Sequence, residues 1–124
     1  ALEKRGVNVI DFHMIKGDLG ELASSLIDAA TIVIGTPTVL GGPHPQAVYA
    51  AYLARALRPG VKFLSIIGSY GWGGKTVEML GDIVSTLKAE IIEPVIIKGY
   101  PTDSDFNMLD GLAQKIADAH SRVL

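Results

Sequence analysis

A short apolar run, Val61-Lys62-Phe63-Leu64-Ser65-Ile66-Ile67, leads directly into a glycine-rich segment, Gly68-Ser69-Tyr70-Gly71-Trp72-Gly73-Gly74. The run is typical of a buried strand, and the residues from Thr76 onward carry apolar side chains at helical spacing. In an open α/β sheet, the loops that follow the carboxyl ends of the strands hold the ligands. Glycines leave this loop conformationally free, while Tyr70 and Trp72 add two aromatic faces. The segment therefore predicts a site for a flat aromatic ligand whose polar edge is bound by backbone N–H groups.

Short apolar runs alternate with helical patterns along the rest of the chain. We expect strands at residues 7–15, 31–35, 61–67 and 91–98, and helices at about 18–30, 45–57, 76–89 and 104–120. Asp18, with Glu21 three residues on, is expected to cap the first helix. In the helix at 45–57, the apolar side chains expected to face inward are those of Val48, Tyr52, Leu53, Ala56 and Leu57. Pro94 cannot donate a hydrogen bond to a neighbouring strand, so the last strand is expected at a sheet edge. This alternation with short loops predicts a doubly wound α/β domain, in which a parallel sheet lies between two layers of helices (α/β/α).

Length and composition favour one globular domain that spans residues 1–124. Apolar residues make up 48% of the chain and the net charge is −2, so no basic surface is expected to attract nucleic acid. There is no cysteine, which excludes disulfides and thiolate chemistry from these residues. No apolar run approaches the length of a membrane span, and the N-terminus has no signal-peptide pattern. We expect a cytoplasmic protein that contacts no membrane.

The first six residues, Ala1-Leu2-Glu3-Lys4-Arg5-Gly6, look like the last turn of a helix that ends at Gly6. A helix that leads into the first strand normally follows a strand of its own. Four strands are therefore visible where five are expected. Since a βαβ unit takes roughly 30 residues or more, we expect either that about 20–30 residues precede this chain or that the protein dispenses with them.

A second loop, Thr36-Pro37-Thr38-Val39-Leu40-Gly41-Gly42, follows the strand at 31–35. Pro37 fixes the backbone of this loop, and the flanking threonine hydroxyls can cap the loop or contact a ligand. Taken alone, the loop could simply turn the chain into the next helix, and Trp72 could equally be a core residue. Both loops follow neighbouring strands at the same edge of a parallel sheet, and this combination favours a ligand site.

Together the two loops resemble those of the flavodoxin-like domain of A-type flavoproteins, also called flavodiiron proteins. The resemblance extends over nearly the whole chain and implies a three-layer flavodoxin-like fold, FMN as the cofactor, and electron transfer within an oxidoreductase. The electron donor would be a redox partner protein or a reduced deazaflavin, a di-iron module would be present in cis or in trans, and a homodimer would be possible. The FMN-binding residues that it implies are Thr36, Pro37, Thr38, Val39, Leu40, Gly41, Ser69, Tyr70, Gly71, Trp72 and Gly73.

Two features of that family have no counterpart in this sequence. The di-iron ligands are missing, and His13, His44 and His120 are scattered singly, so each is expected to be an ordinary solvated or hydrogen-bonded residue. The alternative for His44 is an approach to the ligand, because Gly42-Pro43-His44-Pro45 continues the presumed flavin loop. The Ser/Thr-rich phosphate loop is missing too. Losing three or four charge-assisted hydrogen bonds weakens binding by roughly 5–10 kcal/mol, whereas stacking on an aromatic ring returns only about 1–3 kcal/mol. If the chain is complete, we expect FMN to bind weakly or not at all.

A second hypothesis is a non-catalytic flavodoxin-like module that has lost its flavin and serves association. In the strand order 2-1-3-4-5 the first strand is central, so its absence would leave a gap. Re-pairing of the strands, a strand from a partner or dimerisation would have to close that gap.

Two other motifs do not match the glycine-rich segment. Gly68 and Gly74 are one residue too far apart for a Walker A loop, and Ile67 stands where a nucleophile elbow needs glycine.

Overall fold

The computed structural model describes residues 1–14, 16–39, 42–57, 61–70, 76–85 and 89–123. Within these ranges, no helix is long and apolar enough to cross a membrane. In chain order the elements are the 3-10 helix η1 (Glu3–Arg5), α1 (Leu19–Ile27), β1 (Thr31–Val39), β2 (Gly42–Pro43), α2 (Pro45–Leu57), β3 (Phe63–Tyr70), α3 (Thr76–Ile83), β4 (Glu90–Ile91), β5 (Val95–Lys98) and α4 (Asp103–Val123).

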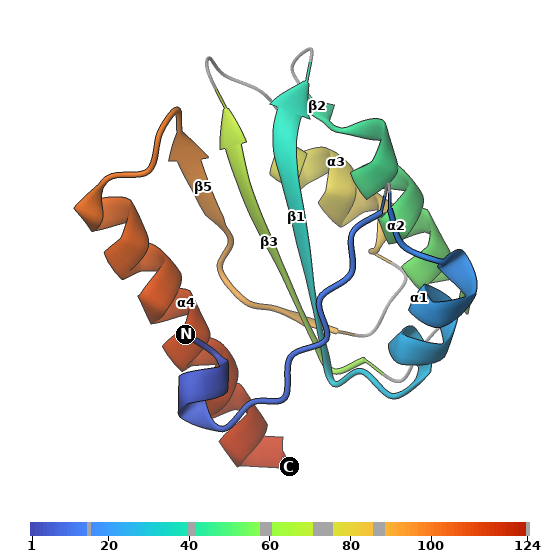
Figure 1. Cartoon of the computed structure of the whole chain (residues 1–124), viewed down its shortest axis with the longest axis horizontal. Coiled ribbons are helices and arrows are strands. Elements are labelled where there is room, and N and C mark those ends of the chain that lie inside the picture. The colour runs from blue at the N-terminus through green and yellow to red at the C-terminus, as the bar shows by residue number, and fades with distance from the viewer. Residues whose placement is uncertain (15, 40–41, 58–60, 71–75, 86–88, 124) are drawn as a thin grey trace.

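The sheet is built around a long parallel pair. β1 and β3 pair over seven residues, from Thr31 opposite Phe63 to Pro37 opposite Ser69. β4 and β5 are two halves of one strand position, since both pair in parallel with β3, and Pro94 lies between them. The expectation that this interrupted strand lies at the edge is confirmed. Figure 1 shows β1, β3 and β5 pointing the same way, so their carboxyl ends meet at one edge of the sheet.

Helices cover both faces of the sheet, which confirms the doubly wound arrangement (Figure 1). On one face, α2 and α3 pack on Ile34, Leu64 and Ile66, and α1 packs beside α2. On the other face, α4 covers Phe63 and Val95, and Leu2, just before η1, packs against this core. Strand residues alternate between these two apolar cores, as expected for strands buried on both faces.

Small side chains form the buried face of α2. Ala47, Ala51 and Ala54 are at most 5% exposed. The helical pattern predicted instead that a larger side chain, Tyr52, would point inward, and this is wrong because Tyr52 is 58% exposed. Alanines at positions i, i+4 and i+7 leave room for the helix to approach the sheet closely, so the tyrosine is turned to solvent.

Residues 7–15 do not form the predicted strand. No strand is assigned to residues 7–14, and Ile15 lies outside the described residues. The segment connects η1 to α1 (Figure 1), and its described backbone hydrogen bonds are local, from Val7 N–H to the Leu2 carbonyl and from Gly17 N–H to the His13 carbonyl. A strand requires hydrogen bonds to a neighbouring strand, and apolar alternation cannot show whether that neighbour is present.

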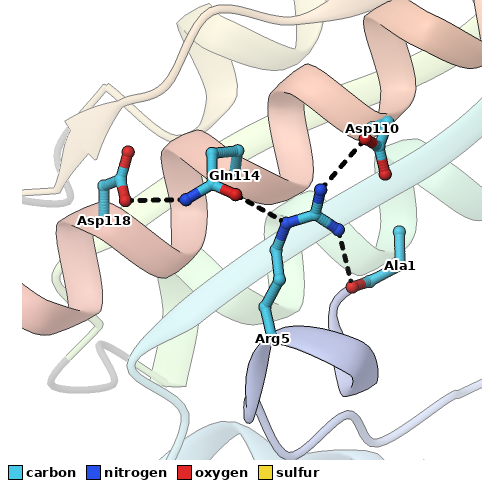
Figure 2. A network of polar contacts seen from close by, with 5 residues as sticks. All are labelled: Ala1, Arg5, Asp110, Gln114 and Asp118. Carbon is cyan, nitrogen blue, oxygen red and sulfur yellow. Dashed lines mark hydrogen bonds and ion pairs between the residues drawn. The ribbon is translucent and has the colours of Figure 1, made fainter.

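A polar network fastens the N-terminal turn to α4 (Figure 2). Arg5 donates to the Gln114 side chain at 2.9 Å, to the Ala1 carbonyl at 2.9 Å and to the Asp110 carboxylate at 3.0 Å. Gln114 in turn donates to Asp118 at 2.9 Å. The turn ends at Gly6, whose φ of 78° lies in the left-handed region, so the predicted C-terminal cap is confirmed.

Replacing Arg5 by alanine is expected to lower the free energy of unfolding by about 1 kcal/mol, since three hydrogen bonds are lost but Asp110 is largely solvated. Amide hydrogen exchange should accelerate at Val7, whose N–H bonds to the turn. The control is Arg122→Ala, which removes one 3.5 Å contact to Glu90 between two exposed side chains. Equal effects of the two substitutions would show that the network does not hold the turn in place.

Candidate functional site

The two loops singled out from the sequence begin side by side. Thr36 lies opposite Gly68, and Pro37 lies opposite Ser69, at the carboxyl end of the longest strand pair in the described sheet. Because paired residues of parallel strands point to the same face, Thr36 and Gly68 lie over the core under α2 and α3. Pro37 and Ser69 lie on the face that carries α4. The sequence prediction that both loops leave one edge of the sheet is confirmed.

The predicted ligand-binding residues divide into two groups. Thr36, Pro37, Thr38 and Val39 form the end of β1, and Ser69 and Tyr70 form the end of β3. Leu40, Gly41, Gly71, Trp72 and Gly73 lie outside the described residues. The structure therefore brings the bases of both loops together, and the contact of each residue with a ligand stays a prediction.

The end of β1 contains a feature that the sequence did not reveal. The strand continues past Gly35 to Val39, and the chain then folds back so that Thr38 pairs with Pro43 and Val39 with Gly42 in the antiparallel sense. This short pairing of β1 with β2 delivers the chain to Pro45, where α2 begins. Proline and glycine at these positions suggested a plain turn, and their pairing became visible only in the folded chain.

Close packing of β1 against β3 depends on Gly68. A Cβ atom added at this position would overlap with the carbonyl oxygen of Thr36 on the neighbouring strand. That oxygen belongs to the backbone and cannot move without shifting the strand. The missing side chain therefore sets how closely the two loop bases approach each other.

Thr36 ties the end of β1 to the segment that precedes α2. Its side chain is buried, and the hydroxyl donates to the Pro37 carbonyl at 2.8 Å and accepts from the His44 backbone N–H at 2.9 Å. The ring of His44 continues this chain of contacts, because its Nδ1 accepts from the backbone N–H of Gln46 at 3.1 Å. His44 was not among the predicted ligand-binding residues.

A second histidine, His120, lies away from this edge. His120 shares a hydrogen bond of 2.6 Å with Thr31 and stacks on Phe63, at the opposite end of the strands, which confirms that it is an ordinary hydrogen-bonded residue. On the α4 side, a hydrogen bond and the positive charge of Lys115 hold the pKa of Glu93 below its ordinary value. Within the described ranges, no group of three or more His, Cys, Asp or Glu side chains could hold a metal ion.

Comparisons with known proteins agree with this architecture, although no family model matches the chain. The chain is 30% identical over 100 residues to the rubredoxin-oxygen oxidoreductase of Megalodesulfovibrio gigas, covering 80% of this chain and 25% of that protein. It is 26% identical over 125 residues to the coenzyme F420H(2) oxidase of Methanocaldococcus jannaschii, covering 94% of this chain and 30% of that protein. It thus spans about a quarter to a third of these relatives.

Solved structures show the same correspondence. The rubredoxin oxygen:oxidoreductase from Desulfovibrio gigas superposes with a TM-score of 0.87 at 27% identity, covering 94% of this chain and 29% of that one. A flavodoxin from the domain Archaea superposes with a TM-score of 0.79 at 22% identity, covering 95% of this chain and 81% of that one, which concerns the fold alone. The chain is a homologue of the flavodiiron, or A-type, flavoproteins, and over most of its length it has their flavodoxin-like fold.

Proposed function

We propose that this chain binds FMN where β1 and β3 end and acts as the electron-transfer domain of an A-type flavoprotein oxidoreductase. The observation that carries the proposal is the pairing of Thr36 with Gly68 and of Pro37 with Ser69. This register sets the bases of the two predicted flavin loops against each other at one edge. Homology to flavodiiron proteins supports the proposal.

The residue types at this edge fit the ring system of a flavin. Neither 36–43 nor 68–74 contains a lysine or arginine. The segments therefore offer backbone N–H groups, hydroxyls and two aromatic rings, which match a flat uncharged ring with carbonyl and nitrogen acceptors. They contain no basic side chain for a phosphate. The ring is thus the part of FMN that these residues would recognise.

The remaining residues would support that ring in different ways. Pro37 is exposed and Ser69 is half-buried, and both lie on the α4 face at the point where the loops begin. Tyr70 and Trp72 would cover the ring and exclude water from it. Bound FMN would supply a carrier for one or two electrons.

The donor and acceptor of those electrons would be other proteins or modules. The names of the relatives mention rubredoxin and coenzyme F420H(2), so a small redox protein or a reduced deazaflavin is the proposed class of donor. A di-iron module, in cis or in trans, is the proposed acceptor. We propose that the chain itself contributes the flavin and no metal ligand.

Replacing Trp72 by alanine tests the contribution of the aromatic loop. Stacking contributes about 1–3 kcal/mol per ring, so the dissociation constant for FMN should rise by roughly 5- to 150-fold. Flavin fluorescence quenching on titration with the protein measures this constant. Tyr52→Ala is the matched control, because Tyr52 is an exposed aromatic on α2. If Trp72→Ala binds FMN as well as the unaltered chain does, the flavin is not stacked on this loop.

A further inference from the structure

The hydroxyl of Thr36 has no proton left for a ligand. A hydroxyl carries one proton, and Thr36 donates it to the Pro37 carbonyl at 2.8 Å. One of its lone pairs accepts from the His44 backbone N–H at 2.9 Å. The side chain is 5% exposed and lies over the core under α2 and α3. Thr36 therefore fixes the backbone of His44 beside the end of β1.

The ring of His44 is fixed as well. Its Nδ1 accepts from the Gln46 N–H at 3.1 Å, and a nitrogen that accepts carries no proton, so the neutral ring has its proton on Nε2. Among the described residues, no contact is found for Nε2. The residue is half-buried between β2 and α2. The Nε2–H donor thus belongs to a residue whose backbone is held by one hydrogen bond to Thr36, at the base of the candidate site.

We propose that the Nε2–H group of His44 donates a hydrogen bond to an acceptor oxygen of the bound flavin, and that Thr36 is a positioning residue which acts through His44. This inference rests on the proposed function. The oxygen belongs either to the ring and its ribityl chain or to the phosphate. Both are hydrogen-bond acceptors, and comparison of FMN with riboflavin, which lacks the phosphate, distinguishes them.

Two substitutions of His44 distinguish the roles of its two ring nitrogens. In His44→Asn, the amide oxygen can still accept from the Gln46 N–H, but the donor at Nε2 is lost. In His44→Gln, the longer side chain can place an amide N–H near the position of Nε2, while the bond from Gln46 is weakened. We expect the dissociation constant for FMN to rise about tenfold in His44→Asn and to change less than about threefold in His44→Gln.

Substitutions of Thr36 test the positioning role. Thr36→Val keeps the shape of the side chain but removes the hydroxyl, and it should weaken FMN binding about as much as His44→Asn does, whereas Thr36→Ser should restore binding. Because both residues act through one contact, the double variant should bind no more weakly than either single variant. Urea unfolding of every variant establishes that the fold is intact.

The experiment is fluorescence titration of each variant with FMN and with riboflavin. If His44→Asn binds both ligands more weakly, the contact is with the ring or ribityl oxygens. If it binds FMN alone more weakly, the contact is with the phosphate. Either result supports the inference. The inference is wrong if His44→Asn binds both ligands as tightly as the unaltered chain does, or if only His44→Gln binds them more weakly. His44 would then serve only as a helix cap. If the unaltered chain binds neither ligand, the proposed function itself fails.

Discussion

Gly68→Ala should both destabilise the fold and weaken flavin binding more than tenfold. The new Cβ would overlap with the Thr36 carbonyl oxygen, and relief requires β1 and β3 to move apart where both loops begin. Overpacking of this kind costs about 2–3 kcal/mol of unfolding free energy. Since the ring must lie between the two loops, a displacement at their bases should raise the dissociation constant for FMN more than tenfold, because even a small misplacement disrupts fixed contacts.

Gly35→Ala is the matched control for this change. Gly35 lies in β1, one residue before Thr36, and a Cβ atom there would meet the Ile67 side chain at 3.4 Å, an ordinary contact. Its unfolding free energy should stay within about 1 kcal/mol of the unaltered chain, and its FMN affinity should be retained. Urea unfolding and flavin titration measure both quantities. If Gly68→Ala behaved like Gly35→Ala, the close approach of β3 to β1 at Gly68 and Thr36 would not be needed for the site.

Leu80→Ala should produce the largest loss of stability without touching the predicted ligand contacts. Leu80 is fully buried in the core formed by α2, α3 and the sheet. Removing a buried leucine side chain costs about 3–5 kcal/mol, because burial is lost and a cavity remains. Such a loss is a large part of the total stability of a domain of this size.

Leu19→Ala is the matched control, because it makes the same leucine-to-alanine change at an exposed position. Leu19 begins α1 and is 43% exposed, so its replacement should cost less than about 1 kcal/mol. Unfolding midpoints in urea give the comparison directly. A similar loss for both variants would mean that the packing of α3 on the sheet does not hold the fold together.

Most of the fold could be predicted because local patterns and the final packing agree. The apolar run at 31–35 lies within β1, residues 63–67 of the run at 61–67 lie within β3, and the interruption at Pro94 separates β4 from β5. Asp18 caps α1 as predicted, since its carboxylate accepts from the Gly20 N–H at 2.7 Å. These features depend on a residue and its immediate neighbours in the chain.

The failures concern features that depend on distant parts of the chain. Residues 7–14 alternate as a strand does, but a strand forms only where another strand supplies its hydrogen bonds. Tyr52 lies on an apolar stripe of α2, yet the alanines of that helix pack on the sheet, because close packing favours the face with small side chains.

The candidate site was predicted at the level of its two loops. Their common edge followed from the parallel strands, whereas the link from Thr36 to His44 spans eight residues and could not be read from either loop. The pairing of β1 with β2 creates this link. Its only sequence signal was the Gly42-Pro43-His44-Pro45 segment, which continues the first loop.

The central claim is that this chain recognises the ring of a flavin at the carboxyl ends of β1 and β3. Its most direct test is parallel titration of the 124-residue chain with FMN and riboflavin, followed by flavin fluorescence. Because the ring-binding segments contain no basic group for the phosphate, we expect weak but saturable quenching at one flavin per chain for both ligands, with dissociation constants between about 10 µM and 1 mM that agree within about tenfold. Absence of saturable binding for both ligands at millimolar concentrations would contradict the claim.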